Sequence, residues 1–400
     1  MRDWTIFRAF RRGREAAPAG LTVAEVRTRR QMDQFVKLPW RIYADDPHWV
    51  PPLLVDVKES LDPRHHPFYR HGAGVRFLAT RDGVAVGRIL ASDDPNYNAQ
   101  RGTNVGCFGF FETIDDAAVS GALLDAAANW LRGRGRASMM GPMDYSTNYP
   151  CGLLVEGFDT PPRVMMNHNP PYYAALLESW GLAKVKDLYA WWFTDPHDMI
   201  AAWRPRAERL EKRGRVTIRP FRLKDFDAEV RRCTEVYNAT IGENWGFVRL
   251  TDAEFRYLAK RIAQLANPQQ VLLAEIDGKT VGFSITLPDI NEATGPLNGR
   301  LTTFGLPIGL IRLFYLLRRV KTARMVVLGL LEGYRRRGIA ELLILKTLDY
   351  GKNVIGYTGA ELGWTLEDNR SVNRTVEAVG AKHYKTYRIY EKKIVDTVNG

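Results

Sequence analysis

Residues 324–351, RMVVLGLLEGYRRRGIAELLILKTLDYG, combine a short apolar run, a basic turn and an amphipathic stretch. The run Met325–Leu331 has the length of a strand and is rich in aliphatic residues, so we predict a buried strand. Gly338 then opens a stretch whose apolar residues recur at helical spacing. The first turn of such a helix carries unpaired N–H groups and the positive end of the helix dipole, and three arginines precede it. The segment therefore predicts a site for the diphosphate of a nucleotide-like cofactor.

The spacing Arg335-x-x-Gly338-x-Ala340 after a strand resembles the Q/R-x-x-G-x-G/A loop of the GNAT superfamily of acyltransferases. In that superfamily the loop holds the diphosphate of acyl-CoA. Taken alone, the same residues also fit a basic, solvated turn between a strand and a helix.

A second motif follows the first in the order that the superfamily has. Glu361–Trp364 is another short apolar run, and Asn369, Val376 and Gly380 have the spacing of the superfamily's N-x-x-A-x-x-x-Y-x-x-x-G helix. Residues 382–393, KHYKTYRIYEKK, resemble its closing aromatic and basic strands. Two linked motifs in this order indicate a GNAT-type α/β (α+β) fold, with a mixed, mostly antiparallel sheet flanked by helices.

Composition restricts the remaining possibilities. The chain has 400 residues, enough for two or three domains, and a net charge of +12, which favours an anionic partner. Its three cysteines are scattered, which argues against a disulfide framework or a zinc site, so we expect no metal and a reducing cytoplasm. Arginines interrupt every apolar cluster in residues 1–14, which argues against a secretory signal. No nucleic-acid-binding signature accompanies the charge, so we expect no nucleic acid as a partner.

The same order of elements occurs twice along the chain. In the second half we predict a strand at 215–221, a helix to 266 that begins with a capping box at Thr251, and a hairpin at 270–287 before the cofactor strand. The first half repeats this plan. Its predicted elements lie at 21–28, 31–43, 75–92, 105–112, 117–131, 139–143, 169–181 and 184–194.

The chain therefore resembles two tandem GNAT-like domains. We assign 1–19 to a basic amphipathic segment, 20–195 to a degenerate domain on the acceptor side, 196–213 to a linker helix and 214–396 to the domain that binds acyl-CoA.

The two halves differ at the loop that matters for the cofactor. Where the second half has its three arginines, the first half has Thr113, Ile114, Asp115 and Asp116. Two carboxylates would repel a diphosphate, and they suit the start of a helix. We expect CoA in the second half only, with residues 141–148 and 167–169 of the first half shaping the acceptor side.

The resemblance implies direct attack of an amine on the acyl thioester. A backbone N–H at the strand end 329–331 would hold the thioester oxygen, and a base would take the ammonium proton. The superfamily's usual acid, a tyrosine, is here Val376, so that role cannot be transferred. The base candidates are Glu361, Glu367 and His168. The predicted cofactor-binding residues are Leu330, Leu331, Arg335, Arg336, Arg337, Gly338, Ala340 and Asn369.

Two apolar segments bear on the substrate. Residues 304–317, FGLPIGLIRLFYLL, are too short to span a bilayer, and they suit the core, a membrane interface or the wall of an acyl tunnel. Basic residues follow at 318–324. Near the amino terminus, Trp4, Phe7 and Phe10 lie among arginines as a second basic amphipathic candidate. Together the segments favour a protein that faces an anionic membrane surface.

From about residue 20 to 394 the chain resembles a family of bacterial proteins with tandem GNAT-like domains. The shared phrases are GFFE, the run from Gly141 to Asn148, GLLVEGF, YRRRGI, ELGWTLEDN and TYRIYEK. That family includes bacterial ceramide synthases, which transfer a fatty acyl group from acyl-CoA to a sphingoid base. The resemblance implies an acyl-CoA-dependent N-acyltransferase at the inner face of the cytoplasmic membrane. The alternatives are acetylation of a small soluble amine, and an inactive GNAT-like binding protein.

Overall fold

The computed structural model describes residues 20–195, 198–241, 244–303 and 305–395. The predicted segment at 1–19, including Trp4, Phe7 and Phe10, lies outside the described residues. The strands are β1 Leu21–Glu25, β2 Ala73–Arg81, β3 Val84–Asp93, β4 Val105–Thr113, β5 Ser138–Gly141, β6 Leu153–Glu156, β7 Ala183–Phe193, β8 Val216–Pro220, β9 Val271–Ile276, β10 Lys279–Pro288, β11 Thr322–Leu330, β12 Gly359–Leu366 and β13 Lys382–Lys393. The helices are α1 Arg29–Lys37, α2 Pro39–Ile42, α3 Leu54–Ser60, α4 Pro95–Arg101, α5 Ala117–Gly133, α6 Tyr173–Ser179, α7 Met199–Gly214, α8 Phe226–Ile241, α9 Asp252–Leu265, α10 Asn291–Thr294, α11 Ile308–Leu317, α12 Ile339–Tyr350 and α13 Arg370–Ala378.

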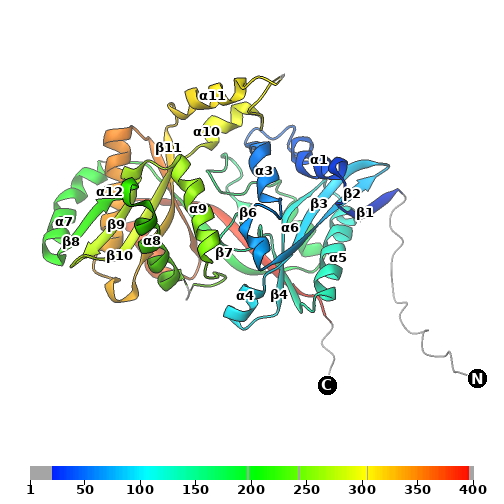
Figure 1. Ribbon diagram of the computed structural model, residues 1–400, viewed down its shortest axis with the longest axis horizontal. Helices are drawn as coiled ribbons and strands as arrows, with labels where there is room; N and C mark the ends of the chain where they lie inside the picture. Colours follow the sequence, from blue (N-terminus) through cyan, green and yellow to red (C-terminus); the bar gives the residue numbers. More distant parts are fainter. Residues whose placement is uncertain (1–19, 196–197, 242–243, 304, 396–400) are drawn as a thin grey trace, which may run out of the picture.

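One continuous sheet runs through both halves of the chain. Its order is β1-β2-β3-β4-β5-β13-β7-β12-β11-β10-β9-β8, and β6 pairs with β13. Neighbours are antiparallel apart from β4–β5 and β11–β12, which are parallel. The predicted mixed, mostly antiparallel fold is confirmed, and Figure 1 shows the halves side by side with helices on both faces.

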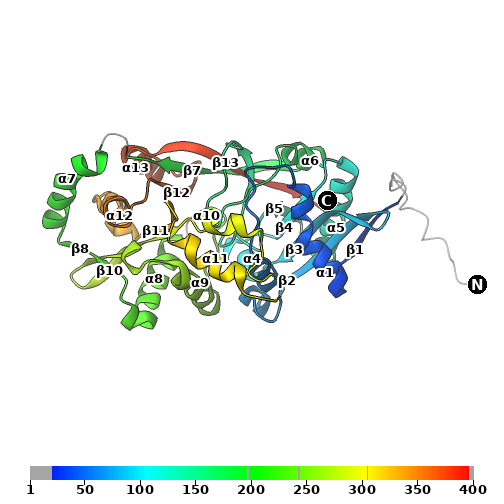
Figure 2. The same cartoon turned by 90° about the horizontal axis from the view of Figure 1, so that it is seen from above.

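The strands that end the two halves are exchanged. We expected residues 184–194 and 382–393 each to complete the sheet of its own half, and this expectation was wrong. Strand β7 pairs with β12 of the second half, β13 pairs with β5 and β6 of the first, and the two pair with each other. Figure 2 shows β13, in red, running from the side of α13 into the first half. The domain boundaries proposed from the sequence thus divide the chain into two halves, whereas a single sheet joins those halves in the structure.

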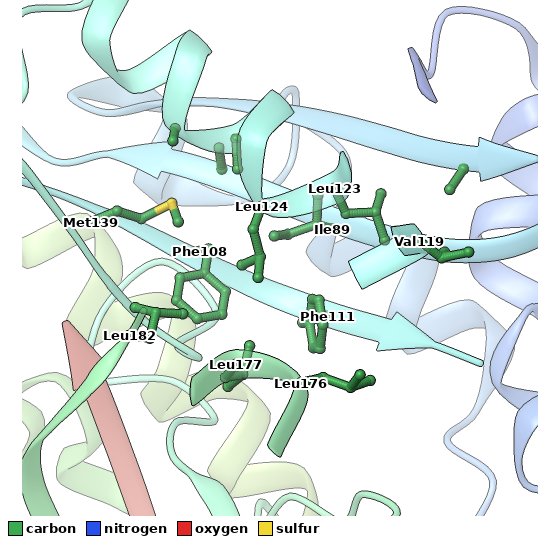
Figure 3. Close-up of a cluster of buried hydrophobic side chains, with 14 of the residues drawn as sticks. Ile89, Phe108, Phe111, Val119, Leu123, Leu124, Met139, Leu176, Leu177 and Leu182 are labelled. Atoms are coloured by element: carbon green, nitrogen blue, oxygen red, sulfur yellow. The ribbon is translucent and has the colours of Figure 1, made fainter. Parts of the chain in front are cut away.

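Each half has its own core. In the first half, α5 and α6 pack on the sheet through a cluster that includes Phe108, Leu124 and Leu177 (Figure 3). In the second, side chains alternate along β9: Val271 and Leu273 face α8 and α9, whereas Leu272 and Ala274 face α7 and α12. This alternation is the period of a strand covered on both faces.

Several local predictions are confirmed. Thr251 caps α9 by accepting from the Glu254 N–H, and the Glu254 side chain accepts from the Thr251 N–H, as a capping box does. Asp116 caps α5 by accepting from the N–H groups of Ala118 and Val119. No helix in the described part of the chain is long and apolar enough to cross a membrane.

Candidate active site

Strands β11 and β12 run together and then part. They pair in parallel only from Thr322 opposite Gly359 to Met325 opposite Leu362. Strand β11 continues alongside β10 as far as Leu330, with a bulge where Val326 is skipped in the register. A V-shaped opening between the two strands follows, and the peptide groups of β11 past Met325 lack β12 as a partner.

The basic loop joins this opening to the start of α12. Gly338 precedes the helix with a φ of 79°, and Arg336 also has a positive φ, of 63°. The first backbone bond of the helix runs from the Leu342 N–H to the Gly338 carbonyl at 3.0 Å. The preceding amides of residues 339–341 are those that a helix leaves without an intrahelical acceptor. Together with the helix dipole and the arginines they suit an anionic group.

A cavity of about 680 Å³ extends from this loop through the opening into the second half. Five of the predicted cofactor-binding residues line it, and these are Leu330, Arg335, Arg336, Ala340 and Asn369. The volume is within the range of about 300–1,000 Å³ that is usual for ligand sites.

The other three predicted cofactor residues lie beside the cavity without lining it. The Leu331 N–H donates to the Val281 carbonyl at 2.9 Å, so this amide is already bonded. The Arg337 guanidinium lies over the Tyr334 ring. A Cβ on Gly338 would lie 2.8 Å from Leu210 of α7, so this glycine permits packing against α7 as well as the positive φ.

The deeper arm of the cavity is apolar. It runs between the helices α8 and α9 and the strands β9, β10 and β11. Its walls are formed by Phe226, Val230, Cys233, Phe255, Leu258, Ala259, Ile262, Val271, Phe283 and Ile285. An elongated hydrocarbon group would bury its apolar surface against these walls.

The first half contributes one polar wall to the cavity. Thr147, Asn148 and Tyr149 line it, and the first two belong to the segment 141–148. The Tyr237 hydroxyl donates to Asn148 Oδ1 at 2.7 Å, which ties this wall to α8. In contrast, the 167–169 segment is structural: Asn169 Oδ1, for example, accepts from the Leu154 N–H at 2.7 Å.

The corresponding opening in the first half is filled by its own chain. The Met143 N–H donates to the Phe108 carbonyl at 2.6 Å, and the Phe110 N–H donates to Asp144 Oδ1 at 2.9 Å. A Cβ on Gly109 would lie 2.2 Å from the Met143 oxygen. The chain thus occupies the position that remains open in the second half, and a carboxylate caps α5 where arginines precede α12.

Glu361 lies below the opening in a buried ion pair. Its Oε1 accepts from Arg324 Nε at 2.6 Å, and its Oε2 accepts from the Tyr384 hydroxyl. Burial raises the pKa of Glu361, while Arg324 and the Tyr384 hydrogen bond oppose that rise. Arg324 lines the cavity and Glu361 does not. The geometry therefore gives Glu361 the task of holding Arg324 in place.

The other two base candidates lie outside the cavity lining. Glu367 accepts from Lys184 Nζ at 2.7 Å and from the Asp187 N–H at 3.0 Å. His168 Nε2 lies 2.8 Å from Asp46 Oδ2, and burial lowers the pKa of this histidine. The structure thus does not bring Glu361, Glu367 and His168 together at one reacting centre.

The sequence did not identify the polar side chains that line the cavity and come from several different elements. Three of these polar groups are the Arg324 guanidinium and the hydroxyls of Tyr149 and Tyr237. They lie far apart in the sequence, in a strand, a loop and a helix. Val376 lines the cavity at the position of the superfamily's tyrosine. Tyr384 and Tyr387 of β13, the strand that follows Val376, do not line the cavity.

Residues 232–380 match the profile described as the acetyltransferase (GNAT) family. The chain is 37% identical over 389 residues to "Bacterial ceramide synthase" of Caulobacter vibrioides, covering 95% of this chain and 99% of the relative. The chain belongs to the GNAT family. It is also 35% identical to "Protein YghO" of Escherichia coli, covering 92% of this chain and 94% of that protein.

Two solved GNAT structures share the fold of this chain over nearly its whole length. A tandem GNAT protein from the clavulanic acid biosynthesis pathway superposes with a TM-score of 0.57 at 14% identity, covering 94% of this chain and 99% of that one. A GCN5-related N-acetyltransferase from Sphaerobacter thermophilus gives 0.55 at 13% identity, covering 96% and 98%. At these identities the likeness concerns the fold. Membership of the GNAT family makes the protein an acyltransferase, and that family generally uses acyl-CoA as its co-substrate.

Proposed function

We propose that the protein transfers a fatty acyl group from acyl-CoA to the amine of a long-chain, sphingoid-type base to give a ceramide. The observation that carries the proposal is the continuity of the cavity. One end has Arg335, Arg336 and the start of α12, which suit a diphosphate, and the other has the apolar arm between α8, α9 and the sheet. The name of the Caulobacter relative supports the same class of acceptor.

In this proposal the diphosphate of CoA meets the amides at the start of α12 and the arginine loop. The pantetheine arm then follows β11 through the opening towards Val326. The Leu331 amide is bonded to Val281 and cannot be the donor for the thioester oxygen, so we place that donor at the bulge around Val326. A backbone N–H aimed at the developing oxyanion stabilises the transition state.

Acetylation of a small soluble amine is the second candidate. It would leave the apolar arm without a use, because an acetyl group has no chain to extend along the apolar walls between α8, α9 and the sheet. Residues 304–317 also argue against acetylation of a small soluble amine, because that function would require this apolar segment to be packed in the core. Phe304 lies outside the described residues, and of α11 only Gly309 is buried.

We further propose that α11 attaches the protein to an anionic membrane surface, at the inner face of the cytoplasmic membrane. Ile308, Ile311, Phe314 and Tyr315 on α11 are each at least half exposed. Arg318 and Arg319 follow directly and are also exposed, and Arg319 lies over the Tyr315 ring. An apolar face flanked by cations is the pattern of interfacial helices. Figure 1 shows α11 at the upper edge of the molecule.

The test is turnover by the purified protein. Acetyl-CoA or palmitoyl-CoA is incubated with a sphingoid base, while free thiol and the lipid product are followed. We expect thiol release and an N-acyl product with palmitoyl-CoA. Thiol release with acetyl-CoA alone would favour the small-amine alternative, and no turnover with either donor across a panel of amines would favour an inactive binding protein.

A further inference from the structure

Four polar side chains form a chain that leads away from the cavity. Tyr149 lines the cavity, and its hydroxyl donates to Glu254 Oε1 at 3.3 Å. Glu254 Oε1 lies 4.0 Å from His71 Nε2, which in turn lies 3.5 Å from Asp94 Oδ1. The side chains of Glu254 and Asp94 are 6% and 4% exposed, whereas that of His71 is 17% exposed. The chain therefore connects the cavity to a histidine that solvent reaches.

Helix caps hold both carboxylates in position. Glu254 uses Oε2 for the Thr251 N–H and hydroxyl, which leaves Oε1 facing Tyr149 and His71. Asp94 caps α4 by accepting from the N–H groups of Asn96 and Tyr97. A residue at a helix cap has little freedom to turn away, so both carboxylates stay close to the same ring nitrogen, His71 Nε2.

An acyl transfer to an alkyl amine needs such a path. An alkyl ammonium resembles that of lysine, whose pKa is about 10.4, so near neutral pH the acceptor arrives protonated and without a lone pair. None of the three base candidates named from the sequence lines the cavity. Tyr149 does line it, and its hydroxyl donates to the buried carboxylate of Glu254.

We propose that Tyr149, Glu254, His71 and Asp94 form a proton relay that takes the ammonium proton of the acceptor to solvent. The inference rests on the proposed function and deepens it, because it requires the acceptor amine to meet the wall of the cavity that carries Tyr149. Tyr149 is the member that touches the substrate. Glu254 receives the proton, His71 passes it to solvent and Asp94 orients the imidazole.

The proton and electron count is balanced. The ammonium gives one proton to the Tyr149 oxygen as the phenol gives its own to Glu254, and His71 carries a proton from Glu254 to water. The free amine then attacks the thioester carbon, forming the C–N bond. The C–S bond breaks with its electron pair on sulfur, and the second proton of the nitrogen goes to the thiolate or to water.

Other titratable groups face the relay and are kept out of it by their own partners. His66 lies beside Tyr149 with the rings tilted and their centroids 5.0 Å apart, and burial lowers the pKa of His66 to about 4, so it stays neutral near pH 7. The Tyr237 hydroxyl donates to Asn148, and the Tyr257 hydroxyl lies within hydrogen-bonding distance of Glu59 and Arg261. Cys107 and Tyr97 are the ionisable neighbours of Asp94, and burial raises the pKa of each.

Conservative substitutions separate the relay from its structural surroundings. Glu254→Gln retains a residue that serves the capping box, and Tyr149→Phe removes only a hydroxyl. Tyr257→Phe is the matched control, because Tyr257 is on the same helix and its hydroxyl lies outside the relay. Each variant is assayed as the full chain with palmitoyl-CoA and a sphingoid base across pH, and its melting temperature is recorded.

We expect Glu254→Gln and Tyr149→Phe to lower kcat about 100-fold or more near pH 7, the usual scale of general base catalysis, with the KM for acyl-CoA unchanged. The loss should shrink as pH rises, because the amine then loses its proton in solution. Tyr257→Phe should behave as the wild type. If the two variants fold and keep wild-type kcat at every pH, or lose the same factor at every pH, the relay is wrong. If the wild type itself forms no amide, the proposed function fails first.

Discussion

Arg324 Nε donates to Glu361 Oε1 at 2.6 Å at the level where β11 and β12 are still paired, immediately before they part. The remaining guanidinium nitrogens donate to the carbonyls of Val164 and Gly363 at 2.9 and 3.0 Å. The side chains of Arg324 and Glu361 are 4% and 0% exposed. The pair thus ties both strands and the first half together at the floor of the opening.

Removing one partner of this pair should be costly. Glu361→Ala leaves a buried guanidinium without its carboxylate, which typically costs about 3–5 kcal/mol in the free energy of unfolding. Urea denaturation measures this loss, and the double variant Arg324→Met with Glu361→Leu should recover part of it. A Glu361→Ala variant of wild-type stability, with a changed pH profile of kcat, would instead make Glu361 a base.

The arginine loop should decide acyl-CoA affinity. Arg335→Glu with Arg336→Glu places two carboxylates where the cavity meets the start of α12, so we expect a loss of at least about tenfold per charge-assisted contact. Arg337→Glu is the internal comparison, because that side chain lies over Tyr334 and should matter less. Calorimetric titration with acyl-CoA measures both. Wild-type affinity in the double variant would remove the diphosphate from this loop.

His66 should make stability depend on pH. Burial, aided by the charge of Arg261, lowers the pKa of His66 to about 4, against an ordinary value of about 6.5 in the unfolded chain. Between these values the unfolded chain holds the extra proton, so stability is lost as pH falls through this window. The full difference is about 3 kcal/mol.

His66→Phe keeps an aromatic ring beside Tyr145 and Tyr149 and removes the titration. Its free energy of unfolding should fall less than that of the wild type as pH drops from about 6.5 to about 4.5. Equally steep curves for the two proteins would place the acid sensitivity elsewhere.

The exposed face of α11 should decide membrane attachment. Ile311 and Phe314 are 67% and 61% exposed, so Ile311→Glu with Phe314→Glu should leave the melting temperature unchanged. Burying each apolar side chain in a bilayer is worth about 1.5–3 kcal/mol, so binding to vesicles of phosphatidylglycerol should fall by about tenfold or more per residue. Val354→Glu is the control, since Val354 is 65% exposed on another segment. Equal binding by both variants would contradict a docking role for α11.

Much of this fold was predictable from the sequence, because many of its elements are determined by residues that are close together in the chain. The strand before the arginine loop, the capping box at Thr251 and the hairpin at Asp277-Gly278 each follow from residues a few positions apart. The exchange of β7 and β13 does not, since no residues a few positions apart in either strand specify which half of the sheet it joins. Only the packing of the whole chain selects its partners.

The candidate site, like the fold, was predictable only where its residues lie close together in the sequence. Arg335, Arg336 and Ala340 lie in one motif, so the spacing located them. Glu361 was named for its chemistry, but its pairing with Arg324, 37 residues away, assigns it to structure. Tyr149 and Glu254 come from different halves and meet only in the fold, and neither residue belongs to a motif that would have marked it.

The most direct measurement is the length of the acyl chain in the amide product. The wild type and Ala259→Trp are each incubated, in separate reactions, with an equimolar mixture of acyl-CoA donors from acetyl to stearoyl and with a sphingoid base as acceptor. Ala259 lines the apolar arm, so the larger ring shortens it. Mass spectrometry of the amide should show long chains for the wild type and a shift to shorter chains for the variant. An acetyl amide from the wild type, or the same chain lengths from both proteins, would contradict a fatty acyl group in this arm.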